Sequence, residues 1–240
     1  MVHIEGRDFQ RCVLQQHHPA RVRRGEGQGL GAKAATMIIA EESYETTQPT
    51  IDSNIVKLKS SGADVFVNIT TPKFAAQAIK KMGEVQWKPL HLLNNVSASI
   101  GAVMKPAGFD AGQGIISSAY LKDTSDPQWK NDAGMKAFDE FLTKHFPEGN
   151  RVDANVMYGY TVAQGLVHVL KQCGDNLTRE NVMKQAASLD MTLPMSLPGV
   201  NIKTSADDFF PIEREKLARF DGKTWEPIGP VISAGLAKTN

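Results

Sequence analysis

The chain has 240 residues, 41% of them hydrophobic and 22% charged, with a formal net charge of +1. This composition is typical of a folded globular protein and excludes a disordered chain, collagen and a coiled coil. The balanced charge also argues against nucleic acid as a partner, because phosphate recognition requires clustered Lys and Arg. With no run of about 18 apolar residues and no apolar N-terminal signal segment, the sequence predicts neither a membrane span nor a signal peptide.

The first thirty residues differ in composition from the rest of the chain. They contain five of the nine arginines and none of the eighteen lysines. They show neither the alternation of a strand nor a sustained helical stripe. We therefore predict that residues 1–30 are an anomalous leader, disordered or translated out of frame, and not part of the fold.

Beyond this leader, short apolar runs alternate with amphipathic segments. Residues 36–40, 64–69, 89–93 and 114–120 have the apolar character and flanking turn residues of buried strands. Parallel strands need a crossover segment between them, and the amphipathic segments supply it. The pattern predicts an α/β fold with a parallel, doubly wound sheet and helices on both faces.

Two helices are predicted between the first three strands. The first places Ile51, Ile55 and Leu58 at helical spacing and ends near 60–62. The second begins at Pro72 in the first helical position, with Thr71 as the cap residue before it. Its inward stripe consists of Phe74, Ala75, Ala78, Ile79 and Met82.

Helical patterns without strands occupy some sixty residues after Asp126-Pro127. They form three apolar stripes, the last of which follows the candidate cap Thr178. The stripes consist of Met135, Phe138, Phe141, Leu142 and Phe146; of Val162, Leu166, Val169 and Leu170; and of Val182, Ala186 and Leu189. Helices with an apolar face but no sheet of their own imply a sheet supplied by a partner or by missing sequence. Strand-like runs then return over 209–232, with a hairpin turn at Asp221-Gly222.

Several long segments carry a resemblance to a known family. They are EESYETTQPTIDSNIVKLKSSGADVFVNITTPKFAAQAIKKM, LHLLNNVSASIGAVMKPAG, YGYTVAQGLVHVLKQCG and ARFDGKTWEPIGPVI. In this order, from Ala40 to Ile232, the chain resembles the periplasmic solute-binding proteins of ABC importers for leucine, isoleucine, valine and related acids. The resemblance implies the type I periplasmic-binding fold, in which two α/β lobes close over a small ligand and the loaded protein docks on the permease.

The resemblance also implies how the chain divides. Residues 31–125 and 200–240 would form a near-complete C-terminal lobe, lobe two. Residues 126–199 would be the helical remainder of an incomplete N-terminal lobe, lobe one. An N-terminal truncation of this kind predicts exposed apolar side chains at Phe138, Phe141, Leu166 and Leu170, with poor solubility or association. It also predicts weak ligand binding, or none.

Candidate ligand-binding residues follow two of the predicted strands. Ligands of open parallel sheets bind at the carboxyl ends of strands, and the residues found there are Thr70, Thr71, Asn94, Asn95, Val96 and Ser97. The alternative is that Thr71 and Ser97 only cap helices and the asparagines only turn the chain. The resemblance adds Tyr158 as an aromatic wall from lobe one. Tyr160 fits core packing with a satisfied hydroxyl at least as well.

One departure from the family bears on the ligand. Where amino-acid binders of the family carry an acid for the ammonium of the ligand, this chain has the neutral run 94–97. A buried ammonium without a carboxylate costs several kcal/mol. An aromatic or aliphatic carboxylate, or a neutral amide, therefore becomes plausible beside a branched-chain amino acid.

No catalytic or metal-binding constellation is found in the sequence. The glycines at 25–31 do not meet the dinucleotide fingerprint, and the histidines lack ligand spacing. Cys12 and Cys173 are far apart, and neither has an indicated His partner. We expect no enzyme, no metal and no cofactor.

Two functions of different classes remain open. The first is the substrate-binding component of an ABC importer, with permease subunits as partners and a periplasmic location for the intact family member. The alternative is a ligand-sensing regulatory domain of the same fold. Gene neighbours encoding a permease and an ATPase would distinguish them.

Overall fold

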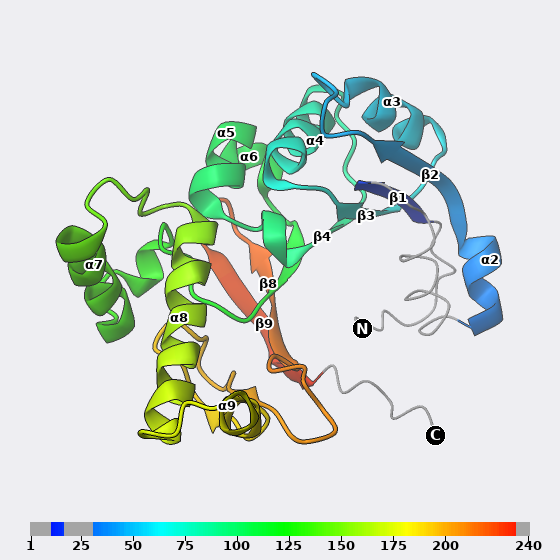
Figure 1. Cartoon of the computed structure of the whole chain (residues 1–240). Helices are drawn as coiled ribbons and strands as arrows, with labels where there is room; N and C mark the ends of the chain where they lie inside the picture. Colours follow the sequence, from blue (N-terminus) through cyan, green and yellow to red (C-terminus); the bar gives the residue numbers. More distant parts are fainter. Residues whose placement is uncertain (1–10, 17–30, 234–240) are drawn as a thin grey trace. The chain divides into compact units, whose positions relative to one another are not determined.

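The computed structural model of the chain describes residues 11–16 and 31–233 (Figure 1). The chain divides into two compact units. The first consists of Met1–Ser117 and Arg219–Glu226, and the second of Ser118–Ala218 and Pro227–Asn240. Each unit is described by itself below.

The first unit is built on parallel strands joined by helices. In chain order the elements are β1 (Arg11–Gln16), η1 (Gly31–Lys33), α2 (Ala34–Met37), β2 (Ile38–Tyr44), α3 (Asp52–Ser60), β3 (Val65–Ile69), α4 (Pro72–Glu84), β4 (Leu90–Leu93), η2 (Asn95–Ser97), the π-helix η3 (Ile100–Met104), α5 (Lys105–Ala107), α6 (Phe109–Gly112) and β5 (Ile116–Ala119). The strand order is β2-β1-β3-β4-β5-β8-β9, and neighbouring pairs from β2 to β5 are parallel. The predicted α/β fold with a largely parallel sheet is confirmed.

The predicted helices and strands of this unit are largely found. Each residue of the inward stripe predicted for the second helix is buried in α4. The exception is the predicted strand at 36–40, where α2 runs to Met37 and the strand begins at Ile38. The alanines at this point favour a helical turn, and the Thr36 hydroxyl donates to the carbonyl oxygen of Lys33. The first strand was therefore predicted two residues too early.

The prediction that residues 1–30 hold no element of the fold is wrong for residues 11–16. These residues form β1, which pairs in parallel with β2 on one side and with β3 on the other. Cys12, Val13 and Leu14 are fully buried. A run of three apolar residues in an interior strand is buried on both faces, so it shows no alternation. Residues 1–10 and 17–30 lie outside the described part of the chain.

The core of the first unit lies between the sheet and helices α3 and α4 (Figure 1). Leu14, Phe66 and Phe74 are at most 2% exposed and belong to one apolar cluster. The rings of Tyr44 and Phe74 lie 4.4 Å apart, and those of Phe66 and Trp87 lie 5.3 Å apart. The Tyr44–Phe74 contact lies at the carboxyl end of β2, on the side of the candidate site, whereas the Phe66–Trp87 contact lies near the amino ends of β3 and β4.

The second unit is mostly helical. Its elements are η4 (Pro127–Trp129), α7 (Ala133–His145), α8 (Ala154–Cys173), α9 (Arg179–Ala186), β6 (Asp190–Met191), β7 (Ile202–Lys203) and most of β8 (Arg214–Phe220) and β9 (Trp225–Ser233). Asp132, Asp153 and Thr178 cap the three helices through side-chain oxygens that accept backbone N–H groups. The cap predicted at Thr178 is thus confirmed. The turn between β8 and β9 belongs to the first unit, and there Asp221 Oδ1 accepts from the N–H groups of Lys223 and Thr224.

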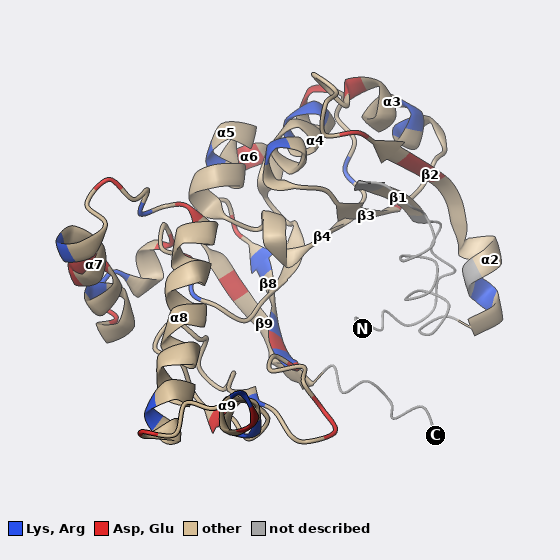
Figure 2. Ribbon diagram, viewed as in Figure 1, with Lys and Arg blue, Asp and Glu red and all other residues tan. Residues whose placement is uncertain are grey.

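The apolar surface predicted on these helices is present. Phe141 is 43% exposed, Leu166 54% and Leu170 41%. The prediction is wrong for Phe138, which is 2% exposed because it packs into a local cluster with Leu142 and Met157. Figure 2 shows α8 largely without charge along its length. Tyr158 and Val162 add to the exposed apolar side chains of α8.

We expect this exposed surface of α8 to control the solubility of the chain. Replacing Val162 and Leu166 by Lys should lower the binding of a hydrophobic dye severalfold and raise solubility, because two exposed apolar side chains of α8 are then replaced by charged ones. Gln172→Lys, an exposed substitution on the same helix, is the control for added charge. Equal dye binding by the wild type and the double variant would contradict the exposure of this surface.

Candidate functional site

The candidate site is the edge at which strands β3, β4 and β5 end. The strands run in register, with Asn68 opposite Leu93 and Leu93 opposite Ser117. The residues that follow β3 and β4 therefore lie on the same edge of the sheet. These are the two loops singled out in the sequence, 70–71 and 94–97.

Thr70 and Ser97 are buried within this edge. Thr70 is 1% exposed, and its hydroxyl donates to Asn68 Oδ1 over 2.7 Å. The Ser97 hydroxyl donates to the carbonyl oxygen of Thr70, and Ser97 is fully buried. Both hydroxyls therefore bond to the protein itself, and contact with a ligand stays a prediction for these two residues.

Thr71 joins the β3–α4 loop to the end of β2. Its backbone N–H donates to the hydroxyl oxygen of Tyr44 over 2.8 Å, and the Tyr44 hydroxyl lies 3.3 Å from Thr71 Oγ1. Tyr44 is 2% exposed. Thr71 occupies the N-cap position of α4, as predicted, but its side chain does not cap a backbone N–H. Its half-buried side chain remains a candidate for ligand contact.

The β4–η2 loop presents an unused acceptor. Asn94 Nδ2 donates to the carbonyl oxygen of Thr70 over 3.2 Å. Asn94 Oδ1 is buried and has no hydrogen-bond partner among the described residues. Beside it, Asn95 is half-buried and Val96 is 62% exposed. This buried amide oxygen therefore keeps its capacity to accept a hydrogen bond from an N–H or O–H group.

Two residues of this edge were not singled out in the sequence. Asn68 is fully buried within β3, and His91 is 4% exposed within β4. Asn68 Nδ2 and His91 Nε2 lie 3.1 Å apart. Burial lowers the pKa of His91 to about 3, so the imidazole is neutral at physiological pH. A polar residue inside an otherwise apolar strand, such as Asn68 in VFVNI, was the signal that could have identified the pair.

The predicted aromatic residues belong to the second unit. Tyr158 is 48% exposed on α8. Tyr160 packs against Phe138 and Phe141, with ring centroids 5.1 and 5.0 Å apart, and its hydroxyl accepts a hydrogen bond from Gln164. This arrangement agrees with the core-packing interpretation of Tyr160. The role of Tyr158 as an aromatic wall stays a prediction.

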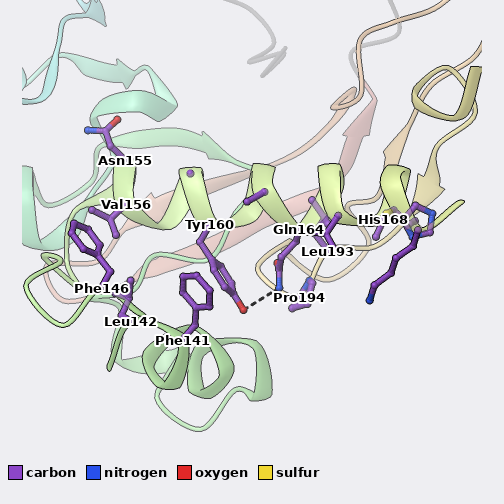
Figure 3. A pocket seen from close by; sticks show the side chains of 15 residues that line it. Phe141, Leu142, Phe146, Asn155, Val156, Tyr160, Gln164, His168, Leu193 and Pro194 are labelled. Atoms are coloured by element: carbon purple, nitrogen blue, oxygen red, sulfur yellow. Dashed lines mark hydrogen bonds between the residues drawn. The ribbon is translucent and has the colours of Figure 1, made fainter. Parts of the chain in front are cut away.

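A separate pocket of about 750 Å³ lies in the second unit, between α7, α8 and the segment 191–194 (Figure 3). Its walls are mostly apolar, and its lining includes His168 and Lys171 but no acid. Gln164 Oε1 in this pocket is buried and has no hydrogen-bond partner within the described part of the chain. Tyr160 lines the pocket and Tyr158 does not. None of the predicted ligand-binding residues belongs to this lining.

Within the described residues, the side chains offer little for bond chemistry. No group of three His, Cys, Asp or Glu side chains is placed to hold a metal ion there. Burial raises the pKa of the Cys12 thiol to about 12, which keeps it protonated and unreactive. None of the described helices is both long and apolar enough to cross a bilayer. The amide and hydroxyl groups of the strand-end edge supply hydrogen bonding and no acid–base or nucleophilic group.

Comparison with known proteins identifies the family. The family model described as "Periplasmic binding protein" matches residues 18–224, most of the chain. The chain belongs to the periplasmic binding protein family. Members of this family bind substrates for ABC importers and are not enzymes. The match begins within the segment predicted to be a leader, so family-like sequence starts earlier than Ala40.

Three solved binding proteins share the fold of this chain. One is a branched-chain amino acid ABC transporter protein from Thermus thermophilus with bound valine, at 15% identity and a TM-score of 0.74. The second is a substrate-binding periplasmic protein from Ralstonia solanacearum, at 19% identity and a TM-score of 0.69. The third is a solute-binding protein from R. palustris in complex with benzoate, at 17% identity and a TM-score of 0.69. They confirm the type I periplasmic-binding fold.

The chain is shorter than these binding proteins. The three alignments cover 95%, 94% and 94% of this chain but only 61%, 61% and 60% of the other chains. No curated protein sequence matches the chain.

Proposed function

We propose that the chain acts in solute capture for an ABC importer, as the substrate-binding component or the larger part of one. The observation that supports this most is the family match over residues 18–224. The strand-end loops of the first unit supply the polar edge at which such a ligand would bind. Permease subunits are the proposed partner, and the periplasm is the proposed location.

The proposed ligand is a small amino acid or a related carboxylate or amide, and the loops favour a hydrogen-bond donor. Asn94 Nδ2 is bonded within the protein, whereas Asn94 Oδ1 is not. A buried acceptor without a partner costs about 1–3 kcal/mol, so a ligand that donates to it gains affinity. An ammonium or an amide N–H satisfies this oxygen, and a carboxylate does not. We therefore propose that the N–H end of the ligand faces this loop.

The division into lobes is also part of the proposal. We assign residues 31–125 and 200–240 to lobe two and 126–199 to the remainder of lobe one. The compact units support it for 31–117 and 219–226, which lie in the first unit, and for 126–199, which lies in the second. They place 118–125, 200–218 and 227–240 in the second unit as well. Under this assignment Thr70, Thr71 and the loop 94–97 belong to one lobe and Tyr158 to the other.

Adding a carboxylate to the β4–η2 loop tests the class of ligand. Asn95→Asp leaves the hydrogen bond of Asn94 in place and adds one negative charge. We expect tighter valine binding and weaker benzoate binding, each by about tenfold, because a charge pair is gained in one case and like charges meet in the other. Competition calorimetry would measure both affinities.

The control is Asn131→Asp, which adds the same charge at an exposed position of the second unit. Equal effects of the two substitutions would exclude the β4–η2 loop as the site. Turnover of a bound metabolite by the purified chain would contradict the proposed function as a whole.

A further inference from the structure

A chain of buried hydrogen bonds connects His91 to both strand-end loops. His91, Asn68, Thr70 and Ser97 are each at most 4% exposed. Asn68 Nδ2 lies 3.1 Å from His91 Nε2, and Asn68 Oδ1 accepts from the Thr70 hydroxyl. The Thr70 carbonyl oxygen then accepts from Asn94 Nδ2 and from the Ser97 hydroxyl. These bonds connect β3 and the loop after it with β4 and the loop after it, and the bond between Asn68 and Thr70 lies within the end of β3 itself.

The directions of these bonds depend on His91. An amide nitrogen can only donate, so Asn68 Nδ2 requires a lone pair on His91 Nε2. The proton of the neutral imidazole must then be on Nδ1. With its nitrogen held by His91, the Asn68 side chain presents its oxygen to Thr70. The backbone carbonyl of Asn68 also accepts from the Asn94 N–H over 3.0 Å, so Asn68 holds both loops.

We propose that His91 and Asn68 are positioning residues for the strand-end loops. The lone pair of His91 Nε2 orients the Asn68 amide, the amide anchors Thr70, and Thr70 anchors Asn94 and Ser97. Asn94 Oδ1 takes no part in these bonds and has no partner among the residues that the structure describes. The expected consequence for affinity rests on the proposed function; the positioning of the loops does not.

The surroundings of His91 keep its lone pair available. The imidazole packs against the Phe66 ring at 4.7 Å, and Phe66 packs against Trp87. Desolvation is the cause of the lowered pKa of His91, and no charged neighbour contributes to it. The neutral form therefore persists over the whole physiological range.

The test compares His91→Gln with His91→Met. The Gln side chain can place an amide oxygen near the position of Nε2 and accept from Asn68, whereas Met fills similar space without an acceptor. Both variants remove the imidazole ring, so ring-current effects cancel between them. His145→Met, at an exposed position, is the control for loss of a histidine.

Nitrogen-15 NMR gives the first readouts. For the wild type at neutral pH we expect an unprotonated Nε2 and a protonated Nδ1. The backbone amide resonances of Thr71, Asn94 and Ser97 should be displaced from their wild-type positions further in His91→Met than in His91→Gln. A protonated Nε2 in the wild type, or equal displacement in both variants, would overturn the proposal.

Binding of valine and benzoate gives the second readout. His91→Met should weaken whichever probe binds the wild type by about fivefold, as expected for the loss of one oriented hydrogen bond. His91→Gln should retain most of the affinity. Displaced loop resonances without binding of either probe would support the positioning and contradict the proposed function. Unchanged affinity in a His91→Met variant with displaced loops would overturn the link between the two.

Discussion

Leu14→Ala is expected to lower the free energy of unfolding by about 2–5 kcal/mol, as for other buried leucines truncated to alanine. Leu14 is fully buried, because β1 lies between β2 and β3 in the sheet. Its side chain belongs to the apolar cluster that includes Phe66 and Phe74. Denaturant unfolding followed by circular dichroism would measure the change.

The matched control is Val56→Ala in α3, where the side chain is 45% exposed. We expect this control to change the free energy of unfolding by less than about 0.5 kcal/mol. The higher helix propensity of Ala offsets part of the lost side-chain contact. If Leu14→Ala behaved like the control, residues 11–16 would not belong to the sheet. The prediction of a leader outside the fold would then be correct after all.

The stability of the first unit is expected to fall steeply as the pH drops below about 6.5, because of His91. The pKa of His91 is about 3 in the folded chain and 6.5 in the unfolded chain. Between these values the unfolded chain binds a proton that the folded chain excludes, so stability rises with pH. The contribution is fully present above pH 6.5 and lost as the pH falls toward 3. Between these two limits the free energy of unfolding changes by roughly 5 kcal/mol.

His91→Gln separates this effect from the titration of carboxylates. The free energies of unfolding of the wild type and the variant would be measured from pH 7 to pH 4. That of the wild type should fall relative to that of the variant as the pH falls. The difference should change by about 1.4 kcal/mol per pH unit once the unfolded histidine is protonated. A constant difference across this range would contradict a neutral, desolvated His91.

The fold could be predicted where periodicity was unambiguous. The stripe of α4 has five residues at helical spacing, and all five are buried. β1 could not be predicted in the same way, because Cys12-Val13-Leu14 is too short to separate a strand from a chance apolar run. The compositional argument for residues 1–30 averaged over a segment that includes this strand.

Burial on the helices of the second unit was predicted only in part. Phe138 and Phe141 belong to the same predicted stripe, yet Phe138 is 2% exposed and Phe141 is 43% exposed. The difference comes from α8 and Met195, whose positions are not encoded in the local pattern of α7. Tertiary contacts decided which face of the stripe was covered.

The candidate site was predicted at the level of loops and not of individual bonds. The rule that ligands bind at the carboxyl ends of parallel strands led to Thr70, Thr71 and the run 94–97. It could not show that Thr70 and Ser97 bond to each other, or that Asn94 keeps one oxygen free. Asn68 and His91 each stand as a single polar residue within a strand, but their pairing depends on the register of β3 and β4, which the local pattern does not encode.

The most direct test of ligand capture at the strand-end loops is a chemical-shift titration of the labelled chain. Valine, benzoate and benzamide would be added separately up to millimolar concentration. We predict weak binding, with perturbed amides confined to Thr71, Asn94, Asn95, Val96 and Ser97, and larger perturbations with the N–H-bearing ligands. Sub-micromolar binding would contradict the prediction of an incomplete site. Perturbations confined to the pocket between α7 and α8, or none with any of the three compounds, would contradict the proposed site.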